Sequence, residues 1–399
     1  MLKLGTAKVD ITPQFPVPLA GFEFRSGVFE QVLTRLFARI FFFQPESGPA
    51  VILVSADLIW WGSDRVSSMR ERMRQQPGAG NAVILLHATH NHSGPQTAAT
   101  LSPLIGEASP AWLETMENAV IGGIGEAVST CETVCIARGS GVCDIGIHRR
   151  RLVDGTILMA PSRDGPIDPE CTVIRFQTLT GETKALLVHF TCHPTTTGGN
   201  SVHGEFCGVA MTIIEDRIGN SAIAGFLQGC CGDIRPALIR DDQFYRGGME
   251  DVLRLGSELS GVVLKVLASP MQPCEPTPCT AHQITLPLYF EHTAENTADS
   301  ALLEMTRVLL GSQLGFFTFN AEMVVRYGFL IKQESLLPLA YTGGMIGYVT
   351  TEQQLAEGGY EAREAFRYFR MPGPFAASTE SRIHEAIAHG RENPARQST

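Results

Sequence analysis

The sequence has no apolar run long enough to cross a bilayer, which takes about 20 consecutive residues in a helix. The apolar stretch LFARIFFF at residues 36–43 is short and contains an arginine, so it predicts a buried strand. The first residues, MLKLGTAKVDITP, also lack the charged head, apolar segment and small-residue cleavage site of a secretion signal. We therefore expect a cytoplasmic protein without membrane insertion.

Charged residues are also scarce, at 18% of the chain, and the net charge is −10. The one dense basic cluster, HRRR at residues 148–151, is too small to offset this acidity. Nucleic acid is excluded as a general partner, because its binding depends on many Lys and Arg contacts to phosphates. The composition, with 44% hydrophobic residues, favours a compact enzyme that acts on a small molecule, and it leaves the oligomeric state open.

Several catalytic and metal-binding signatures are absent. The sequence has no HExxH motif, which excludes a helix-borne metalloprotease site. It also has no GxSxG nucleophile elbow, no P-loop and no GxGxxG after a predicted strand, which disfavours α/β-hydrolases and nucleotide-dependent enzymes. The ten cysteines form no CxxC pair and no regular framework, so we expect neither a structural zinc site made of cysteines nor disulfides.

Predicted strands and helices alternate along the chain. Buried strands are predicted at 50–57, 81–88 and 221–229, and a hairpin at 171–191. Helices are predicted at 63–76, 109–129, 249–269 and 297–311. This alternation predicts a mixed α/β fold in which layered β-sheets are flanked by helices, with residues 1–399 in a single domain. The proline-rich stretch 269–280 is either an internal linker or a surface loop.

Histidine is distributed unevenly: of 11 in the chain, three lie between residues 87 and 92, in LLHATHNHSGP. They follow an apolar run and precede a Ser-Gly-Pro turn, as expected at the end of a strand. On an extended segment, His90 and His92 point to the same face. Either these side chains are hydrogen-bonded near the core, or they present ligands to a cleft.

A second histidine-rich stretch favours the ligand interpretation. The segment VHFTCHPTTTGGNSVHGEF also follows a predicted strand, and it supplies His189, His193, His203 and Glu205. Neutral imidazole is a common zinc ligand, and a catalytic zinc keeps an open position for water beside its protein ligands. Two histidine-bearing strand ends in one chain therefore predict a shared metal site.

A third stretch, FLQGCCGDIRPALI, places Asp233 and Arg235 at the end of a predicted strand. A tight turn with an ion pair between these residues would explain the pattern. Alternatively, the carboxylate orients a ligating histidine, or the arginine holds an anionic group of a substrate. Both residues are therefore candidates for substrate binding.

Several blocks occur in an order typical of one enzyme family. They are GTAKVDITP and LAGF near the N-terminus, ATHNHSGP at 88–95, HPT at 193–195, QGCCGD at 228–233, FFTFNAEMVVRYG at 316–328 and YVTTEQQLAEGGYEA at 348–362. Together they resemble the neutral/alkaline (non-lysosomal) ceramidase family. The resemblance covers nearly the whole chain and corresponds to the catalytic domain of that family only. The immunoglobulin-like C-terminal domain of the family's ceramide-hydrolysing members is not expected here.

The resemblance implies a zinc ion held by His90, His193, Glu322 and Tyr348. It implies that His92 stands beside the metal-bound water as a proton shuttle and oxyanion partner. It further implies that Tyr360 donates to the substrate carbonyl, and that Arg149 contacts the substrate.

The chain departs from the family pattern at one important block. Where the family has a serine and an asparagine in Gly-Asp-Val-Ser-Pro-Asn, this chain has Arg235 and Ala237. A mechanism with that serine as nucleophile cannot operate, whereas water activated by a metal can. An arginine at this position suits a carboxylate or another anion better than a long sphingoid chain.

These observations predict a cytoplasmic zinc hydrolase that cleaves an amide-type C–N bond of a small polar or anionic substrate. One alternative is a zinc esterase or lactonase on the same site, because zinc hydroxide does not by itself choose the leaving atom. The other alternative is a non-catalytic, metal-containing binding protein.

Overall fold

A computed structural model describes residues 1–291 and 300–392. Its largest element is a nine-stranded sheet with the strand order β12-β10-β9-β6-β1-β3-β4-β5, in which β16 also pairs with β6. The strands are β1 (Leu2–Asp10), β3 (Phe37–Pro45), β4 (Val51–Ala56), β5 (Val83–Ala88), β6 (Glu132–Val142), β9 (Glu170–Thr178), β10 (Thr183–Phe190), β12 (Ile223–Gln228) and β16 (Gln272–Cys274). The sheet is mixed, because β4–β5 and β10–β12 are parallel pairs and the remaining pairs are antiparallel.

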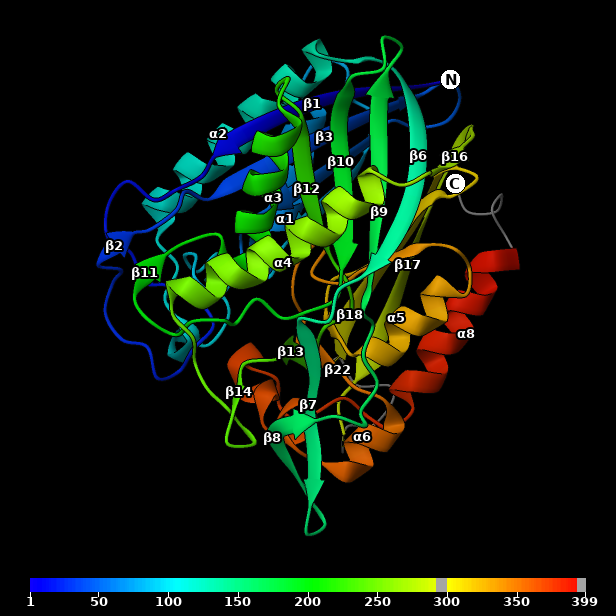
Figure 1. The fold of residues 1–399 in the computed structure, drawn as a ribbon. Coiled ribbons are helices and arrows are strands. Elements are labelled where there is room, and N and C mark those ends of the chain that lie inside the picture. Colours follow the sequence, from blue (N-terminus) through cyan, green and yellow to red (C-terminus); the bar gives the residue numbers. More distant parts are fainter. Residues whose placement is uncertain (292–299, 393–399) are drawn as a thin grey trace.

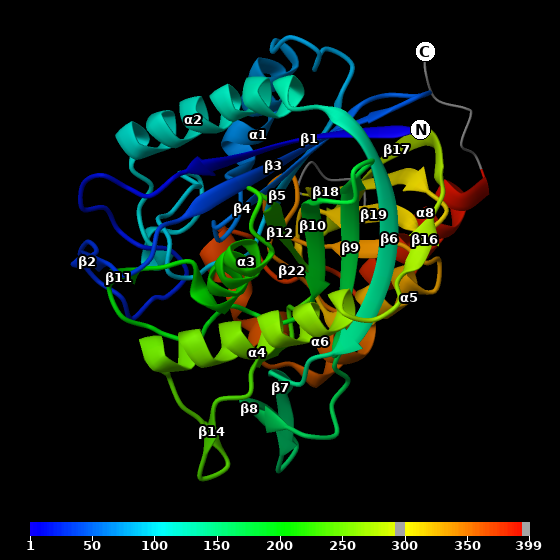
Figure 2. The same cartoon turned by 45° about the horizontal axis from the view of Figure 1, so that its top comes forward.

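The two edges of this sheet approach each other. The Ser55 hydroxyl in β4 donates to the Phe226 carbonyl in β12 at 2.6 Å, and the Gln228 amide in β12 donates to His87 Nε2 in β5 at 2.8 Å. Figure 2 shows β5, β12 and β10 close together at the centre of the molecule. The carboxyl ends of these three strands therefore open into one region.

Helices cover the outer faces of the sheet (Figure 1). The helix α2 (Pro110–Ser129) packs on β1 and β3, with α1 (Ser63–Arg74) beside it. On the other side, α3 (Glu205–Ile218) and α4 (Met249–Leu267) pack against each other and over β12, β6 and β9. Buried apolar side chains of both helices form a core cluster with residues of β9, β10 and β12.

A second sheet packs against the large one through a shared apolar cluster, which includes Phe41 and Phe176 of the large sheet and Phe316 of the second sheet. Its strand order is β17-β18-β19-β21, and its strands are β17 (Pro276–Tyr289), β18 (Ser300–Gly311), β19 (Leu314–Phe319) and β21 (Leu337–Leu339). The predicted helix at 297–311 is therefore wrong where the structure describes it, because residues 300–311 pair as a strand with both β17 and β19. Residues 297–299 lie outside the described residues.

The proline-rich stretch 269–280 belongs to paired structure. It contains β16, which pairs with β6 of the large sheet, and the first residues of β17. Among the described residues, no helix is both long enough and apolar enough to span a membrane. The prediction of a mixed α/β fold with layered sheets and flanking helices is confirmed.

Smaller elements complete the region below and beside the large sheet in Figure 1. Its paired strands are β7 (Gly146–Val153), β8 (Thr156–Ser162) and β13 (Ile234–Pro236) in one sheet, β20 (Glu322–Met323) with β22 (Tyr348–Val349), β14 (Ile239–Arg240) with β15 (Gln243–Phe244), and β2 (Gln31–Val32) with β11 (Ser201–Val202). The C-terminal helices are α5 (Val325–Lys332), α6 (Glu352–Glu357), α7 (Tyr360–Arg363) and α8 (Thr379–Glu392).

Candidate metal centre and active-site cleft

His90 and His193 lie just after the ends of two strands of the large sheet, β5 and β10 respectively. His90 has a φ of 65°, which is uncommon for a residue other than glycine. The loop around it is held by backbone bonds, from Ala88 N to Tyr341 O at 3.1 Å and from Asn91 N to Leu58 O at 2.9 Å. This conformation directs the His90 ring toward that of His193, with the ring centres 4.5 Å apart.

The hydrogen bonds of these two rings fix which nitrogens are free. Nδ1 of His90 bonds to the Ile59 carbonyl at 2.9 Å, and Nδ1 of His193 bonds to the Cys231 carbonyl at 2.7 Å. A carbonyl oxygen only accepts, so both Nδ1 atoms carry hydrogen. In the neutral rings the two Nε2 atoms, 2.9 Å apart, therefore face each other with their lone pairs. Burial lowers the pKa of His193 to about 4, which keeps its ring neutral near pH 7.

The carboxylate of Glu322 joins this pair. Its Oε2 lies 3.3 Å from His90 Nε2 and 3.5 Å from His193 Nε2, and the residue is only 3% exposed. A tetrahedral ion with bonds of about 2.0–2.2 Å holds its ligand atoms roughly 3.3–3.6 Å apart. Three converging lone-pair donors at nearly this spacing are suited to a divalent cation such as zinc. The residues present therefore fit the metal that the resemblance implies.

His92 lies beside this group. Its Nε2 is 3.2 Å from His90 Nε2, and the ligand atoms of His90, His92 and His193 all lie within 4.8 Å of one another. Its Nδ1 is buried without a hydrogen-bond partner among the described residues. Burial holds the pKa of His92 well below its usual value, and His90 and His193 lower it further. The structure thus contains a three-histidine group that could hold a metal ion.

Tyr348 reaches the site through strand pairing. It lies opposite Glu322 in the parallel pair β20–β22, and its hydroxyl accepts a bond from Arg149 Nη2 at 3.0 Å. Arg149 also donates from Nε to Glu361 at 2.7 Å, so its charge is balanced by a buried carboxylate. Burial keeps the pKa of Tyr348 well above its usual value.

A cleft of about 420 Å³ opens onto this group. It is lined by Gly21, Phe22, Glu23, Phe24, His92, Arg149, Met159, His193, Thr195, Arg235, Arg246, Tyr348, Tyr360 and Tyr368. Burial raises the pKa of Tyr360, so at neutral pH this phenol keeps its proton and can donate a hydrogen bond into the cleft. A cleft of this volume is at the lower end of the usual range for small-molecule sites, about 300–1,000 Å³.

Asp233 does not line the cleft. It is fully buried, and its carboxylate accepts bonds from the Val325 amide at 2.8 Å and from Gln354 Nε2 at 2.9 Å. His148 Nε2 lies 3.4 Å from the same carboxylate, and Arg235 makes no ion pair with it. The structure therefore shows Asp233 holding the segments around Val325 and Gln354, and its contact with a substrate stays a prediction.

Tyr341 is a neighbour of the site that the sequence analysis missed. Its ring stacks on that of His90 with centres 4.0 Å apart, and its hydroxyl lies 3.5 Å from Glu322 Oε2. Arg246, Phe22 and Phe24 were also missed as cleft residues. Phe22 lies in the LAGF block but was not assigned a role there, and no motif in the sequence marks Phe24 or Arg246.

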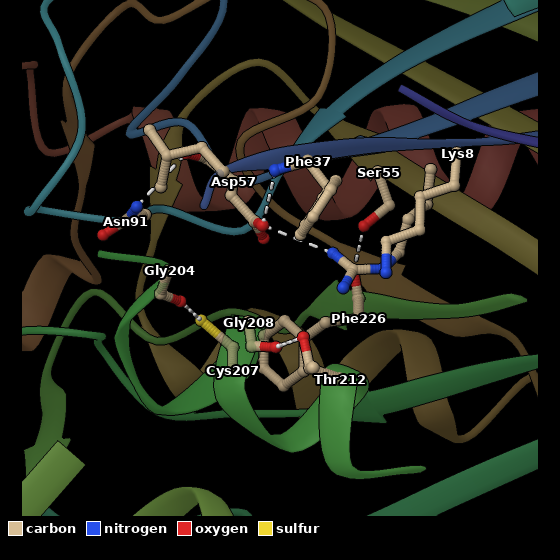
Figure 3. A network of polar contacts seen from close by, with 12 residues as sticks. Lys8, Phe37, Ser55, Asp57, Asn91, Gly204, Cys207, Gly208, Thr212 and Phe226 are labelled. Atoms are coloured by element: carbon tan, nitrogen blue, oxygen red, sulfur yellow. Dashed lines mark hydrogen bonds and ion pairs between the residues drawn. The ribbon is translucent and has the colours of Figure 1, made fainter. Parts of the chain in front are cut away.

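The loop that carries His90 and His92 is anchored from behind. Asn91 donates to the carbonyls of Asp57 at 3.2 Å and His203 at 2.9 Å, and Asp57 accepts from the Phe37 amide (Figure 3). Arg39 Nη1 lies 3.3 Å from the Asp57 carboxylate, and Arg39 Nε donates to Glu215 at 2.9 Å. A buried ionic network thus supports the segment between the two histidines.

The convergence of the ATHNHSGP, HPT and QGCCGD blocks on one centre agrees with a comparison against family models. The model described as "Neutral/alkaline non-lysosomal ceramidase, N-terminal" matches residues 2–243. The chain belongs to this ceramidase family. Membership implies a hydrolase that acts on an amide bond.

Solved ceramidase structures share the fold. A neutral ceramidase from Pseudomonas aeruginosa has a TM-score of 0.80 at 17% identity, covering 100% of this chain and 76% of that one. A structure titled "Ceramidase complexed with C2" has a TM-score of 0.79 at 16% identity, with the same coverage of both chains. No curated protein matches the sequence.

Proposed function

We propose that this ceramidase-family protein is a zinc-dependent hydrolase that cleaves an amide-type C–N bond in a small polar or anionic substrate. The observation that carries the proposal is the convergence of two imidazole Nε2 atoms and one carboxylate, all buried, at the floor of an open cleft. In this proposal His90, His193, Glu322 and Tyr348 hold the ion. Once bound, the ion would polarise the scissile carbonyl and lower the pKa of a water molecule toward about 7.

The chain's own residues supply the remaining chemistry. His92, whose Nε2 faces the centre, takes the proton of the attacking water and transfers it to the leaving nitrogen. Tyr360 donates a hydrogen bond to the carbonyl oxygen as negative charge develops there. Arg149 holds the Tyr348 hydroxyl and borders the bound substrate.

The charge and the volume of the cleft favour a substrate other than ceramide. Arg235 stands where the family pattern has its serine, and it places a positive charge in a cleft of modest volume. A long sphingoid chain gains nothing from such a charge, whereas a polar or anionic group does. The structural relatives are named ceramidases, so ceramide serves as the reference substrate when the proposal is tested.

Elemental analysis of the purified protein, followed by activity assays with metal removed and restored, tests the proposal. We expect about one zinc per chain, and hydrolysis of a small amide faster than hydrolysis of ceramide. The variants His90→Ala and His193→Ala should lose both metal and turnover, whereas the exposed control His384→Ala should keep both. Full zinc occupancy and turnover in either site variant would refute the metal centre. Cleavage of a matched ester without any cleavage of the amide would instead identify an esterase.

A further inference from the structure

Arg235 is a buried cation that no carboxylate among the described residues neutralises. The residue is 8% exposed, and within the described part of the chain its guanidinium makes no hydrogen bond or ion pair. Its Nε is fully buried and unsatisfied, and the face of the group lies over the Phe244 ring at 4.3 Å. Burial, together with Arg149 and Arg246 nearby, lowers the pKa of Arg235 to about 10. A cation held in this way is far better accommodated when an anion binds beside it.

Arg246 contributes a second unpaired positive charge to the same cleft. It makes no ion pair with any residue that the structure describes, and its guanidinium lies over the rings of Phe22 at 4.5 Å and Phe24 at 4.2 Å. These two rings stack on each other at 5.0 Å, and Phe22 lies 4.9 Å from the His92 ring. The aromatic pair thus holds Arg246 on the side of the cleft that carries His92.

The other charges of the cleft are already balanced. Arg149 is paired with Glu361, and the one carboxylate in the cleft lining, Glu23, accepts bonds from Arg367 at 2.8 Å and Tyr368 at 2.5 Å. Arg235 and Arg246 therefore leave a net positive charge that no described side chain neutralises. An anionic group of a bound ligand would balance this excess positive charge.

Strand geometry fixes Arg235 next to the metal centre. The amide of His193 donates to the carbonyl of Ile234 at 3.2 Å. The side chain of Ile234 is buried in the apolar core, so that of the next residue along β13 points to the opposite face, toward the cleft. An anionic group bound to Arg235 would thus lie close enough to the metal centre to be part of the substrate that carries the scissile bond.

We propose that Arg235 and Arg246 form a specificity subsite for a carboxylate, and that the natural substrates are amides bearing a free carboxylate, such as N-acyl amino acids. This inference rests on the proposed amide hydrolysis and names its substrate class. The planar guanidinium of Arg235 presents a fork of donors that matches the two oxygens of a carboxylate. Arg246, at the open side, adds attraction for the incoming anion.

The first experiment compares N-acyl amino acids with their uncharged carboxamides, matched in acyl chain and side chain. Because a hydrogen-bonded charge contact contributes about 10- to 100-fold in affinity, we expect kcat/KM to favour the carboxylate by that factor, mainly through KM. Arg235→Gln should remove most of this preference, mainly by raising KM for the carboxylate member of each pair, and Arg235→Lys should restore part of it. Arg246→Gln should reduce the preference to a smaller extent.

Arg240→Gln is the matched control, because it removes an exposed arginine five positions along the chain that does not line the cleft. The control should keep the wild-type preference. Equal kcat/KM for both members of the pair in the wild type would overturn the inference, as would stronger selection of a phosphonate analogue than of the carboxylate. An unchanged preference in Arg235→Gln would overturn it as well.

Calorimetric binding of the same pairs separates this inference from the proposed function. If no amide is hydrolysed but the carboxylate still binds more tightly than the carboxamide, and Arg235→Gln abolishes the difference, the hydrolase proposal fails and the subsite stands. If amides are cleaved without any difference in binding between the pair, the subsite fails and the hydrolase stands.

Discussion

Glu322 and Tyr348 are opposite residues in the parallel strand pair β20–β22, so the two proposed oxygen ligands are held by one small piece of backbone structure. The amide of Glu322 also bonds to the Gly347 carbonyl at 2.9 Å, immediately before Tyr348. These two residues reach the histidines as a unit. The metal centre that we propose therefore joins the loops after β5 and β10 to this strand pair.

The first prediction concerns Glu322. Changing Glu322 to Gln removes the negative charge beside two imidazole lone pairs, so zinc affinity should fall by at least about 10-fold while the fold is retained. Competition with a chromophoric chelator measures this change. The exposed control Glu352→Gln should bind zinc as the wild type does. An unchanged affinity in Glu322→Gln would remove this residue from the ligand set.

The second prediction separates metal binding from proton transfer at His92. His92→Gln should retain zinc but lower kcat by about 100-fold or more, within the range that general acid–base groups contribute. Metal content and turnover are measured on the same preparation. Loss of the metal would show that His92 is a ligand and not a proton shuttle.

The third prediction concerns the packing of Gly21 against His92. A Cβ at Gly21 would lie 2.3 Å from His92 Nδ1, and the φ of Gly21 is 98°. Gly21→Ala should displace the His92 ring and abolish most turnover. Gly27→Ala is the matched control, because Gly27 has a φ of 76° but no atom within 4 Å of its added Cβ.

Both glycine variants introduce strain of about 1–2 kcal/mol from a positive φ, and the clash at Gly21 adds a further loss of thermal stability in that variant. Only Gly21→Ala should lose activity. Equal activity in the two variants would show that the position of His92 does not depend on this contact.

The fourth prediction concerns the buried network behind the histidine loop. Arg39→Met would leave the buried Asp57 carboxylate without its ionic partner, and should lower the free energy of unfolding by about 3–5 kcal/mol. Arg35→Met breaks an exposed ion pair with Asp10 and should cost at most about 1 kcal/mol. Urea denaturation of both variants gives the comparison. Similar losses of unfolding free energy in the two variants would show that the buried pair stabilises the fold no more than the exposed pair does.

Local patterns predicted much of the fold because they report the burial of each segment. The β-branched runs at 50–57 and 81–88 became β4 and β5, and the helix predicted at 109–129 became α2. The segment 300–311 failed because Leu, Met and Ala are compatible with a helix, and only its pairing with β17 and β19 makes it a strand. Both partner strands are close along the chain, but the residues of 300–311 taken alone do not show that they pair.

The same limit applies to the site. His90 and His193 follow predicted strands, so their convergence could be anticipated from two strand ends. The placement of Glu322 beside them came from the family resemblance alone, because a strand of two residues has no detectable periodicity. Tyr341 and Arg246 gave no signal, since their contacts with His90 and with the cleft arise from loop packing.

The wide separation of the proposed metal ligands along the chain has a consequence for how this protein responds to metal supply. The three buried donors come from segments that the backbone joins only through long connections, so an ion held by all of them acts as a cross-link. Because any ligand specific to the native state shifts the unfolding equilibrium in its favour, chelation should lower the melting temperature and make the chain more susceptible to proteolysis. Scarcity of the ion in a cell would then shorten the lifetime of the protein as well as silence it.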